Sequence, residues 1–223
     1  MRGVSRYTAV ATQSSRPCFA LTEFTSSAMM EFVKVTVTKL QAVRRQLETA
    51  LTLYFDEKDP VSIHTLAAAA YNVLKDLNRK DGGKPMLVKE VSAKQIVEQL
   101  GHTPRVVAEI LNEPENFFKH ADRDADRTLT FNDRQSEVLL FDACGKYGEM
   151  TKDFVPIFAA FVQWFTCHYP QTVRPGFEHL LPPPELMEFA KQVTRRQWLD
   201  YMLSVLGPDG HAVYRDGGRL VVP

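Results

Sequence analysis

The sequence has few cysteines and no excess of charge of either sign, and each shortage excludes a class of protein. Cys18, Cys144 and Cys167 are odd in number, far apart and without a CxxC pair, which excludes a disulfide framework and a zinc knuckle. Because 223 residues can bury a sizeable core without cross-links, we expect a reducing, cytoplasmic location. Basic and acidic residues number 27 each, so no global field favours nucleic acid or an anionic membrane.

Long hydrophobic runs are also missing. The longest strongly apolar stretch, FVPIFAAFVQWF at 154–165, is far shorter than the roughly 20 residues of a membrane-spanning helix. We therefore expect no membrane association and interpret the stretch as a buried helix. An apolar stripe left uncovered on this helix would be buried favourably against a second copy of the chain, which predicts a homodimer. The alternative is that a helix over 183–206 and the N-terminal lead cover it within one chain.

Motifs of the common catalytic folds are absent as well. The sequence contains no P-loop, GxGxxG, HExxH or GxSxG motif, and no Glu-x-x-His of a di-iron bundle. Hydrolytic folds and nucleotide cofactors therefore have no support. We predict that the protein uses no cofactor and is not an enzyme.

The N-terminal lead is poor in acidic residues. Arg2, Arg6 and Arg16 lie among many serines and threonines, and no acid precedes Glu23, a composition typical of an organelle transit peptide. The alternative is an upstream start codon, with translation truly beginning at 29 or 30. Under either interpretation we expect residues 1–30 to be non-globular.

What the sequence does contain is mostly helical periodicity. FVKVTVTK at 32–39 alternates with a period of two and predicts a short strand. Apolar residues then recur every three or four positions, which predicts a helix capped by Thr38. Asp59 and Pro60 begin a second helix that ends near residue 78 and forms a hairpin with the first. Five further helices are expected over 92–100 (capped by Ser92), 104–112, 135–147, 154–168 and 185–206.

These elements predict an all-α bundle of about six or seven helices. Its helical core domain would occupy 31–170, followed by a Pro-rich linker at 171–184. The remaining residues, 185–223, would form a C-terminal helix packed on the core. They end in PDGHAVYRDGGRLVV, where a Gly-rich turn between two apolar runs is typical of a β-hairpin.

The segment NFFKHADRDADRTLTFND at 116–133 resembles the calcium loop of an EF-hand. Candidate ligands stand at loop positions 1, 3, 5, 7 and 12; they are Asp122, Asp124, Asp126, Thr128 and Asp133. Arg127 occupies the position where the sharp turn requires glycine, and the final carboxylate is aspartate rather than the longer glutamate. The alternative is an exposed charged loop between two helices.

Two histidines are candidate ligand-binding residues. Asn116, Lys119 and His120 fall within one helical turn, so their side chains converge if the segment is helical. His64 lies in the alanine-rich SIHTLAAAAY, where tight helix packing with a hydrogen-bonded histidine at its margin is the default interpretation. Alternatively, His64 shares a pocket with His120.

Two stretches carry a resemblance to known proteins. DPVSIHTLAAAAYNVL and NFFKHADRDADRTLTF resemble parts of an uncharacterised all-helical bacterial family. The Asn and Lys-His near a helix end also resemble the HEPN superfamily of nucleotide- and RNA-binding helical domains, over about residues 33–170. This resemblance implies an RNA partner and pairing of two copies through their helices.

The chain departs from the HEPN ribonucleases at one motif. Those enzymes resemble one another in an Arg followed four to six residues later by His, whereas the nearest Arg upstream of His120 is Arg105. Lys119 cannot replace it in a bidentate phosphate contact. We therefore expect first a non-enzymatic helical protein that binds a protein partner or a ligand. The alternatives are a HEPN-like RNA-binding protein or ribonuclease, and a calcium-binding protein.

Overall fold

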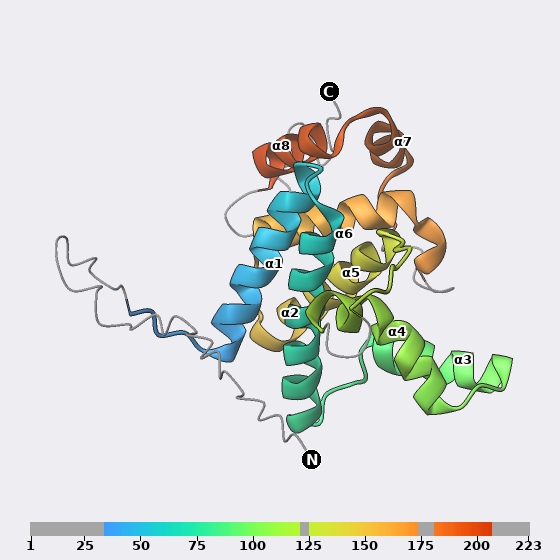
Figure 1. The fold of residues 1–223 in the computed structure, drawn as a ribbon. Helices are drawn as coiled ribbons and strands as arrows, with labels where there is room; N and C mark the ends of the chain where they lie inside the picture. Colours follow the sequence, from blue (N-terminus) through green and yellow to red (C-terminus); the bar gives the residue numbers. More distant parts are fainter. Residues whose placement is uncertain (1–33, 121–124, 174–180, 207–223) are drawn as a thin grey trace, which may run out of the picture. The chain divides into compact units, whose positions relative to one another are not determined.

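The computed structural model describes residues 34–120, 125–173 and 181–206, and regular secondary structure in them is helical (Figure 1). The predicted all-α class is confirmed. The α-helices are α1 (Lys39–Phe55), α2 (Pro60–Lys80), α3 (Ala93–Leu100), α4 (Pro104–Lys119), α5 (Arg134–Thr151), α6 (Pro156–His168), α7 (Pro184–Gln192) and α8 (Arg195–Val205). A π-helical segment, η2 (Leu87–Ser92), leads into α3, and a short 3-10 helix, η3 (Pro170–Thr172), follows α6.

The N-terminal ends of α1 and α2 are set by local hydrogen bonds, as predicted. The Thr38 hydroxyl accepts a hydrogen bond from the Gln41 backbone N–H, and the Gln41 side chain accepts one from the Thr38 N–H. Asp59 accepts from the Ser62 N–H, and Pro60 occupies the first helical position. These caps satisfy N–H groups that have no partner inside the helix. The two helices then pack against each other as the predicted hairpin (Figure 1).

Several predicted boundaries are wrong. Residues 34–38 have no regular structure, so the strand predicted over 32–39 is absent from the part of that segment that the structure describes. Helix α4 continues past residue 112 to Lys119 with Pro114 inside it. Proline usually breaks a helix, but here the following residue, Glu115, is buried and accepts hydrogen bonds from Asn72 and Lys89. Ser92 makes no capping bond, because α3 runs on directly from η2.

The single helix predicted over 185–206 is two helices. Val193 is extended and separates α7 from α8. Thr194 then begins α8 with a second capping box, in which its hydroxyl accepts from the Gln197 N–H and the Gln197 side chain accepts from the Thr194 N–H. Residues 1–30 and the expected C-terminal hairpin lie outside the described residues, as do residues 174–180 of the linker predicted over 171–184. The described part of that linker begins in η3 and ends at the first residue of α7.

The core lies among α1, α2, α5 and α6, and α7 and α8 pack on α6. Trp198 of α8 is fully buried, and its indole N–H donates to the Ala160 carbonyl of α6 at 2.9 Å. No residue of α6 is exposed. The uncovered apolar stripe that motivated a dimer is therefore absent from this helix, because α7 and α8 cover it within the chain. The homodimer itself stays a prediction.

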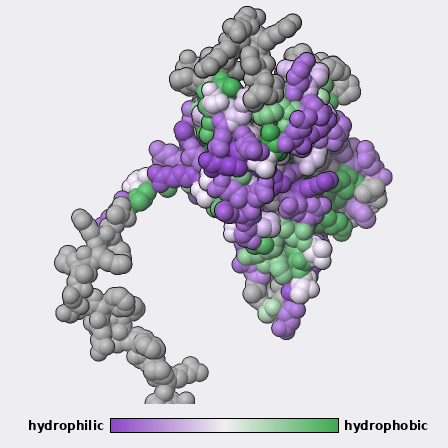
Figure 2. Space-filling view, turned by 90° about the horizontal axis from the view of Figure 1, so that it is seen from above, coloured by the Kyte–Doolittle hydropathy of each residue, from purple (hydrophilic) through white to green (hydrophobic). Residues whose placement is uncertain are grey.

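Two surface properties complete the description. None of the helices in the described ranges has both the length and the apolar content that crossing a membrane requires. In the view of Figure 2, hydrophilic residues dominate, and hydrophobic colour is confined to smaller areas between them. Exposed large apolar side chains are few and include Val106 and Ile110, one turn apart on α4.

Candidate functional site

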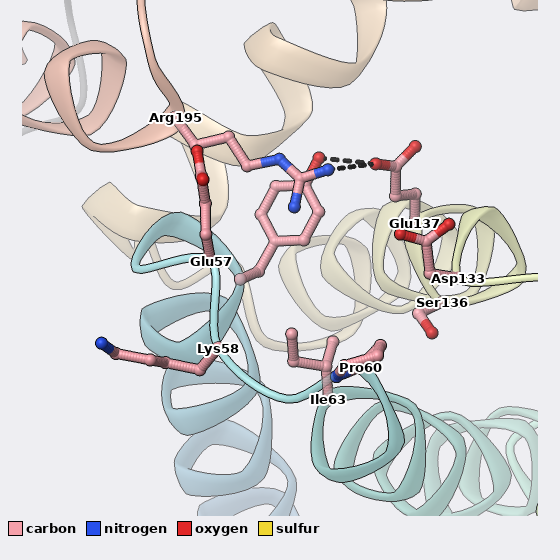
Figure 3. Close-up of a pocket in the computed structure, with 9 residues that line it drawn as sticks. Glu57, Lys58, Pro60, Ile63, Asp133, Ser136, Glu137 and Arg195 are labelled. Carbon is pink, nitrogen blue, oxygen red and sulfur yellow. Dashed lines mark hydrogen bonds and ion pairs between the residues drawn. The ribbon is translucent and has the colours of Figure 1, made fainter.

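A cavity of about 350 Å³ opens where the α1–α2 turn meets the first turns of α5 and α8 (Figure 3). Its lining comes from four places in the chain: Tyr54, Glu57 and Lys58 at the end of α1, Pro60 and Ile63 of α2, Asp133, Ser136 and Glu137 at the start of α5, and Arg195 of α8. The cavity is thus built by residues that are far apart in the sequence. Its volume lies in the lower part of the range of small-molecule sites.

Glu137 is the central acid of this cavity and is only 7 % exposed. The Tyr54 hydroxyl donates to Oε1 at 2.7 Å, and the Tyr169 hydroxyl donates to Oε2 at 2.7 Å. The Trp164 indole N–H in turn donates to the Tyr54 oxygen at 2.9 Å. A buried carboxylate requires such donors, and hydrogen bonds to an ionised acceptor are stronger than neutral ones.

The two phenols remain donors at neutral pH. Burial, followed by the nearby Glu137 carboxylate, raises the pKa of Tyr54 well above its usual range. The same two causes raise the pKa of Tyr169 to about 12. Each oxygen of Glu137 therefore accepts a hydrogen bond from a neutral hydroxyl group, independently of any contact with a cation.

Arg195 is the cation of the cavity. Its Nη2 lies 3.3 Å from Oε1 of Glu137, and its guanidinium carbon lies 4.0 Å from the centre of the Tyr54 ring. Its position is fixed because it is the first residue of α8, directly after the Thr194 capping box. Within the described residues, its Nε and Nη1 make no hydrogen bond, and the side chain is 28 % exposed. Figure 3 shows the guanidinium reaching over the cavity toward Glu137.

Three helix N-termini also meet at the cavity. Ile63 lies in the first turn of α2, Ser136 in the first turn of α5, and Arg195 begins α8. Each N-terminus carries a partial positive charge from aligned peptide dipoles. Together with Arg195 they offset part of the negative charge of the three carboxylates that line the cavity, those of Glu57, Asp133 and Glu137.

His64 lies behind the cavity wall and is not part of its lining. Its ring is 2 % exposed, and Nδ1 lies 3.2 Å from the Ser136 hydroxyl, which faces the cavity. The ring edges of Phe131 and Phe118 pack against it at centroid distances of 4.9 and 5.8 Å. Nε2 has no hydrogen-bond partner in the described chain.

The Ser136–His64 pair has the residue types of a nucleophile and its base, but its geometry does not support catalysis. No carboxylate orients the imidazole through Nε2. Burial, followed by the positive charge of Lys89, lowers the pKa of His64 to about 4. Such an imidazole is a weak base at neutral pH. The pair is therefore a packing contact between α2 and α5.

The other predicted ligand-binding residues lie at the end of α4. Asn116 and His120 are exposed, and Lys119 donates to Oε1 of Glu115 at 2.7 Å. Asn116 and Lys119 lie in the last turn of α4, whereas His120 follows the helix in an extended conformation, so the three residues do not share a helical turn. None of them lines the cavity, so the structure does not bring His64 and His120 together in it.

A second buried polar cluster was not predicted. Lys89 of η2 donates to Oε2 of Glu115 at 2.7 Å and to Asn72 at 3.1 Å, while the Asn72 amide donates to Oε1 of Glu115 at 2.6 Å. Although burial alone would raise the pKa of Glu115, the hydrogen bonds from Lys119 and Lys89 lower it to about 2. The cluster joins α2, η2 and α4, and the spacing of these residues in the sequence does not predict it.

The predicted calcium loop lies only partly within the described residues. Asp122 and Asp124 are outside them, and Asp126 and Thr128 are exposed. Asp133 instead lines the cavity. Arg127, at the position where an EF-hand requires glycine, pairs with Glu113. Among the residues that the structure describes, no group of three or more His, Cys, Asp or Glu side chains is arranged to hold a metal ion.

The sequence does not single out Tyr54, Tyr169, Glu137 or Arg195. One signal is that Glu137 and Arg195 each fall in the first turn of a helix, where the partial positive charge of the helix N-terminus favours a negative group. Comparison of the chain with protein-family models, with curated proteins and with solved structures gives no match, so its resemblance to HEPN domains stays a prediction.

Proposed function

We propose that the chain is a non-enzymatic helical binding protein and that the cavity at Arg195 takes a small organic ligand with a carboxylate group. The observation that carries the proposal is the division of hydrogen bonds around Glu137. Two tyrosine hydroxyls satisfy its two oxygens at 2.7 Å each, so its contact with Arg195 is a single longer one at 3.3 Å. A charge-assisted N–H···O bond is usually shorter, about 2.7–2.9 Å.

Arg195 therefore keeps donors for a ligand. A guanidinium has five N–H donors in a planar fork that matches a carboxylate. The cation–π contact with Tyr54 at 4.0 Å helps to hold the Arg195 guanidinium in place before a ligand arrives, which lowers the entropy lost on binding. The first turns of α2, α5 and α8 add their partial positive charges around the same space.

Calorimetric titration with small carboxylates and their matched carboxamides tests the proposal. We expect at least one carboxylate to bind and its amide to bind about tenfold or more weakly, because a hydrogen bond to a charged group contributes about 1.5–3 kcal/mol. Arg195→Gln should remove this preference.

Arg196→Gln is the matched control. Arg196 is the next residue of α8, is exposed, and pairs with Asp56 and Asp200 outside the cavity. It should leave carboxylate binding unchanged. Equal affinities for acid and amide, or full binding by Arg195→Gln, would contradict the proposed site.

The RNA-binding alternative rests on a different place in the chain. Asn116 and His120 are exposed at the end of α4, but Lys119 between them is hydrogen-bonded to Glu115. Arg105, the nearest upstream arginine, pairs with Glu109 on the surface one turn along the same helix. Both of these cations are thus bonded to a glutamate at 2.7–2.8 Å, whereas the contact of Arg195 with Glu137 is a longer one at 3.3 Å.

A further inference from the structure

We infer that the ligand of the Arg195 cavity is a zwitterion, an amino acid or a close analogue, whose ammonium group binds to Asp133. The inference rests on the proposed function, since it takes the carboxylate site at Arg195 as given. It adds the chemical group at the other end of the ligand.

The charge balance of the cavity calls for a cationic group on the ligand. Three carboxylates line it, those of Glu57, Asp133 and Glu137, against the two cations Lys58 and Arg195. Figure 3 shows Lys58 extending away from the other lining side chains, so the cavity itself has one cation facing an excess of carboxylates. A ligand that brought only a carboxylate would add to this excess.

Glu137 does not take up the cation, because its oxygens are already occupied. Tyr54 and Tyr169 donate to them, and Arg195 makes the third contact. In the described residues, the Asp133 carboxylate takes part in no hydrogen bond or ion pair. Asp133 and Glu57, both exposed, are the lining carboxylates without such partners among the described residues, and Asp133 is the one that stands beside Ser136 on α5.

The local backbone explains why Asp133 is available. An aspartate at the N-cap of a helix usually accepts a hydrogen bond from the N–H of the second or third helical residue. Asp133 has helical dihedral angles, φ −61° and ψ −24°, and its side chain makes no capping bond. The Ser136 N–H bonds to the Asp133 backbone carbonyl instead, and the Arg134 N–H bonds to the Asn132 side chain.

The arrangement in the cavity fits both ends of a zwitterion. Figure 3 shows Asp133 on the α5 side beside Ser136, below Glu137, and Arg195 reaching in from α8. Ile63 and Pro60 supply apolar surface on the α2 side. An ammonium group at Asp133 and a carboxylate at Arg195 would each meet the opposite charge, and the hydrocarbon part would contact α2.

Calorimetry on the full chain tests the inference with sets of three probes: an L-amino acid, the carboxylic acid that lacks its amino group, and the amine that lacks its carboxylate. Leucine, 4-methylpentanoate and 3-methylbutylamine form one set, and polar side chains supply others. We expect the amino acid of at least one set to bind about tenfold or more tightly than either truncated probe. Asp133→Asn should remove the advantage over the acid and leave the affinity for the acid unchanged.

Asp126→Asn is the matched control, because Asp126 is exposed in the preceding loop and does not line the cavity. It should change neither affinity. An acid that binds as tightly as its amino acid, and loses binding in Arg195→Gln, would overturn the zwitterion and keep the carboxylate site. Absence of binding by every probe, or amines that match the amino acids, would overturn the carboxylate site as well. The comparison of probes on the unmodified chain does not depend on how any variant folds.

Discussion

Mild acid should destabilise the fold through His64. The pKa of this buried imidazole in the folded chain is about 4, against 6.5 for an ordinary histidine. Above pH 6.5 the ring is neutral in both states, and its contribution to stability is complete. As the pH falls below 6.5 the unfolded chain takes up a proton that the folded chain excludes, so the free energy of unfolding decreases until about pH 4.

The expected magnitude is large compared with the stability of a typical domain. One pKa unit corresponds to about 1.36 kcal/mol, so the difference between 6.5 and about 4 corresponds to about 3 kcal/mol in total, most of which is lost by pH 4.5. Typical domains have only about 5–15 kcal/mol in all. Glu115 has a pKa of about 2 in the folded chain, so its protonation lowers the free energy of unfolding mainly below pH 4.5. The contributions of His64 and Glu115 therefore fall in different pH ranges.

Urea unfolding between pH 7 and 4.5, followed by tryptophan fluorescence, measures this loss. The charged groups that act on His64 are Lys89 of η2 and Glu115 and Lys119 of α4. His64→Leu should be less stable at pH 7, because Ser136 loses its partner, but should lose about 2–3 kcal/mol less on acidification. His102→Leu, at an exposed histidine, should retain the full loss. An unchanged pH dependence in His64→Leu would refute the reasoning.

Four further predictions concern other parts of the chain. Lys89→Met should lower the free energy of unfolding in urea by about 3 kcal/mol, because it removes the most buried partner of the buried Glu115. The control Lys94→Met, at an exposed lysine, should lower it little, and equal losses in the two variants would contradict the prediction. Trp164→Glu should unfold the chain rather than release folded monomers, because Trp164 is buried. Light scattering of the unmodified protein tests whether it forms a homodimer, and a mass near 25.3 kDa would exclude one. Labelled structured and unstructured RNA should remain intact; cleavage that His120→Ala abolishes would replace the proposed function with a ribonuclease. Millimolar calcium should give no saturable heat, whereas a micromolar dissociation constant lost in Asp122→Ala would establish the calcium loop.

Local signals in the sequence predicted the helices well where caps decide the structure. Thr38 and Asp59 satisfy the first N–H groups of their own helices, so a few neighbouring residues contain the whole signal. The break between α7 and α8 has a signal of the same kind, the Thr194 and Gln197 capping box. The apolar periodicity that continues across it favoured one long helix, and that prediction was wrong.

The π-helix and the cavity depend on contacts that no local pattern contains. The N–H groups of Val88 and Lys89 donate to Asp142 and to the Tyr71 hydroxyl, 54 and 18 residues away in the sequence. Glu137 meets Tyr54 across 83 residues and Arg195 across 58. Such contacts follow from packing of the complete bundle, so composition and spacing could predict the all-α class but not the site.

The hydrogen bond between Trp164 and Tyr54 makes the cavity optically observable without a label. Indole emission depends on the partner of its N–H, and here that partner is a phenol that also donates to Glu137. A carboxylate bound to Arg195 would place a negative charge near the Tyr54 ring and change the field at this indole. The chain has two tryptophans, so Trp198→Phe would leave Trp164 as the single emitter, and its spectrum would report occupancy of the cavity directly.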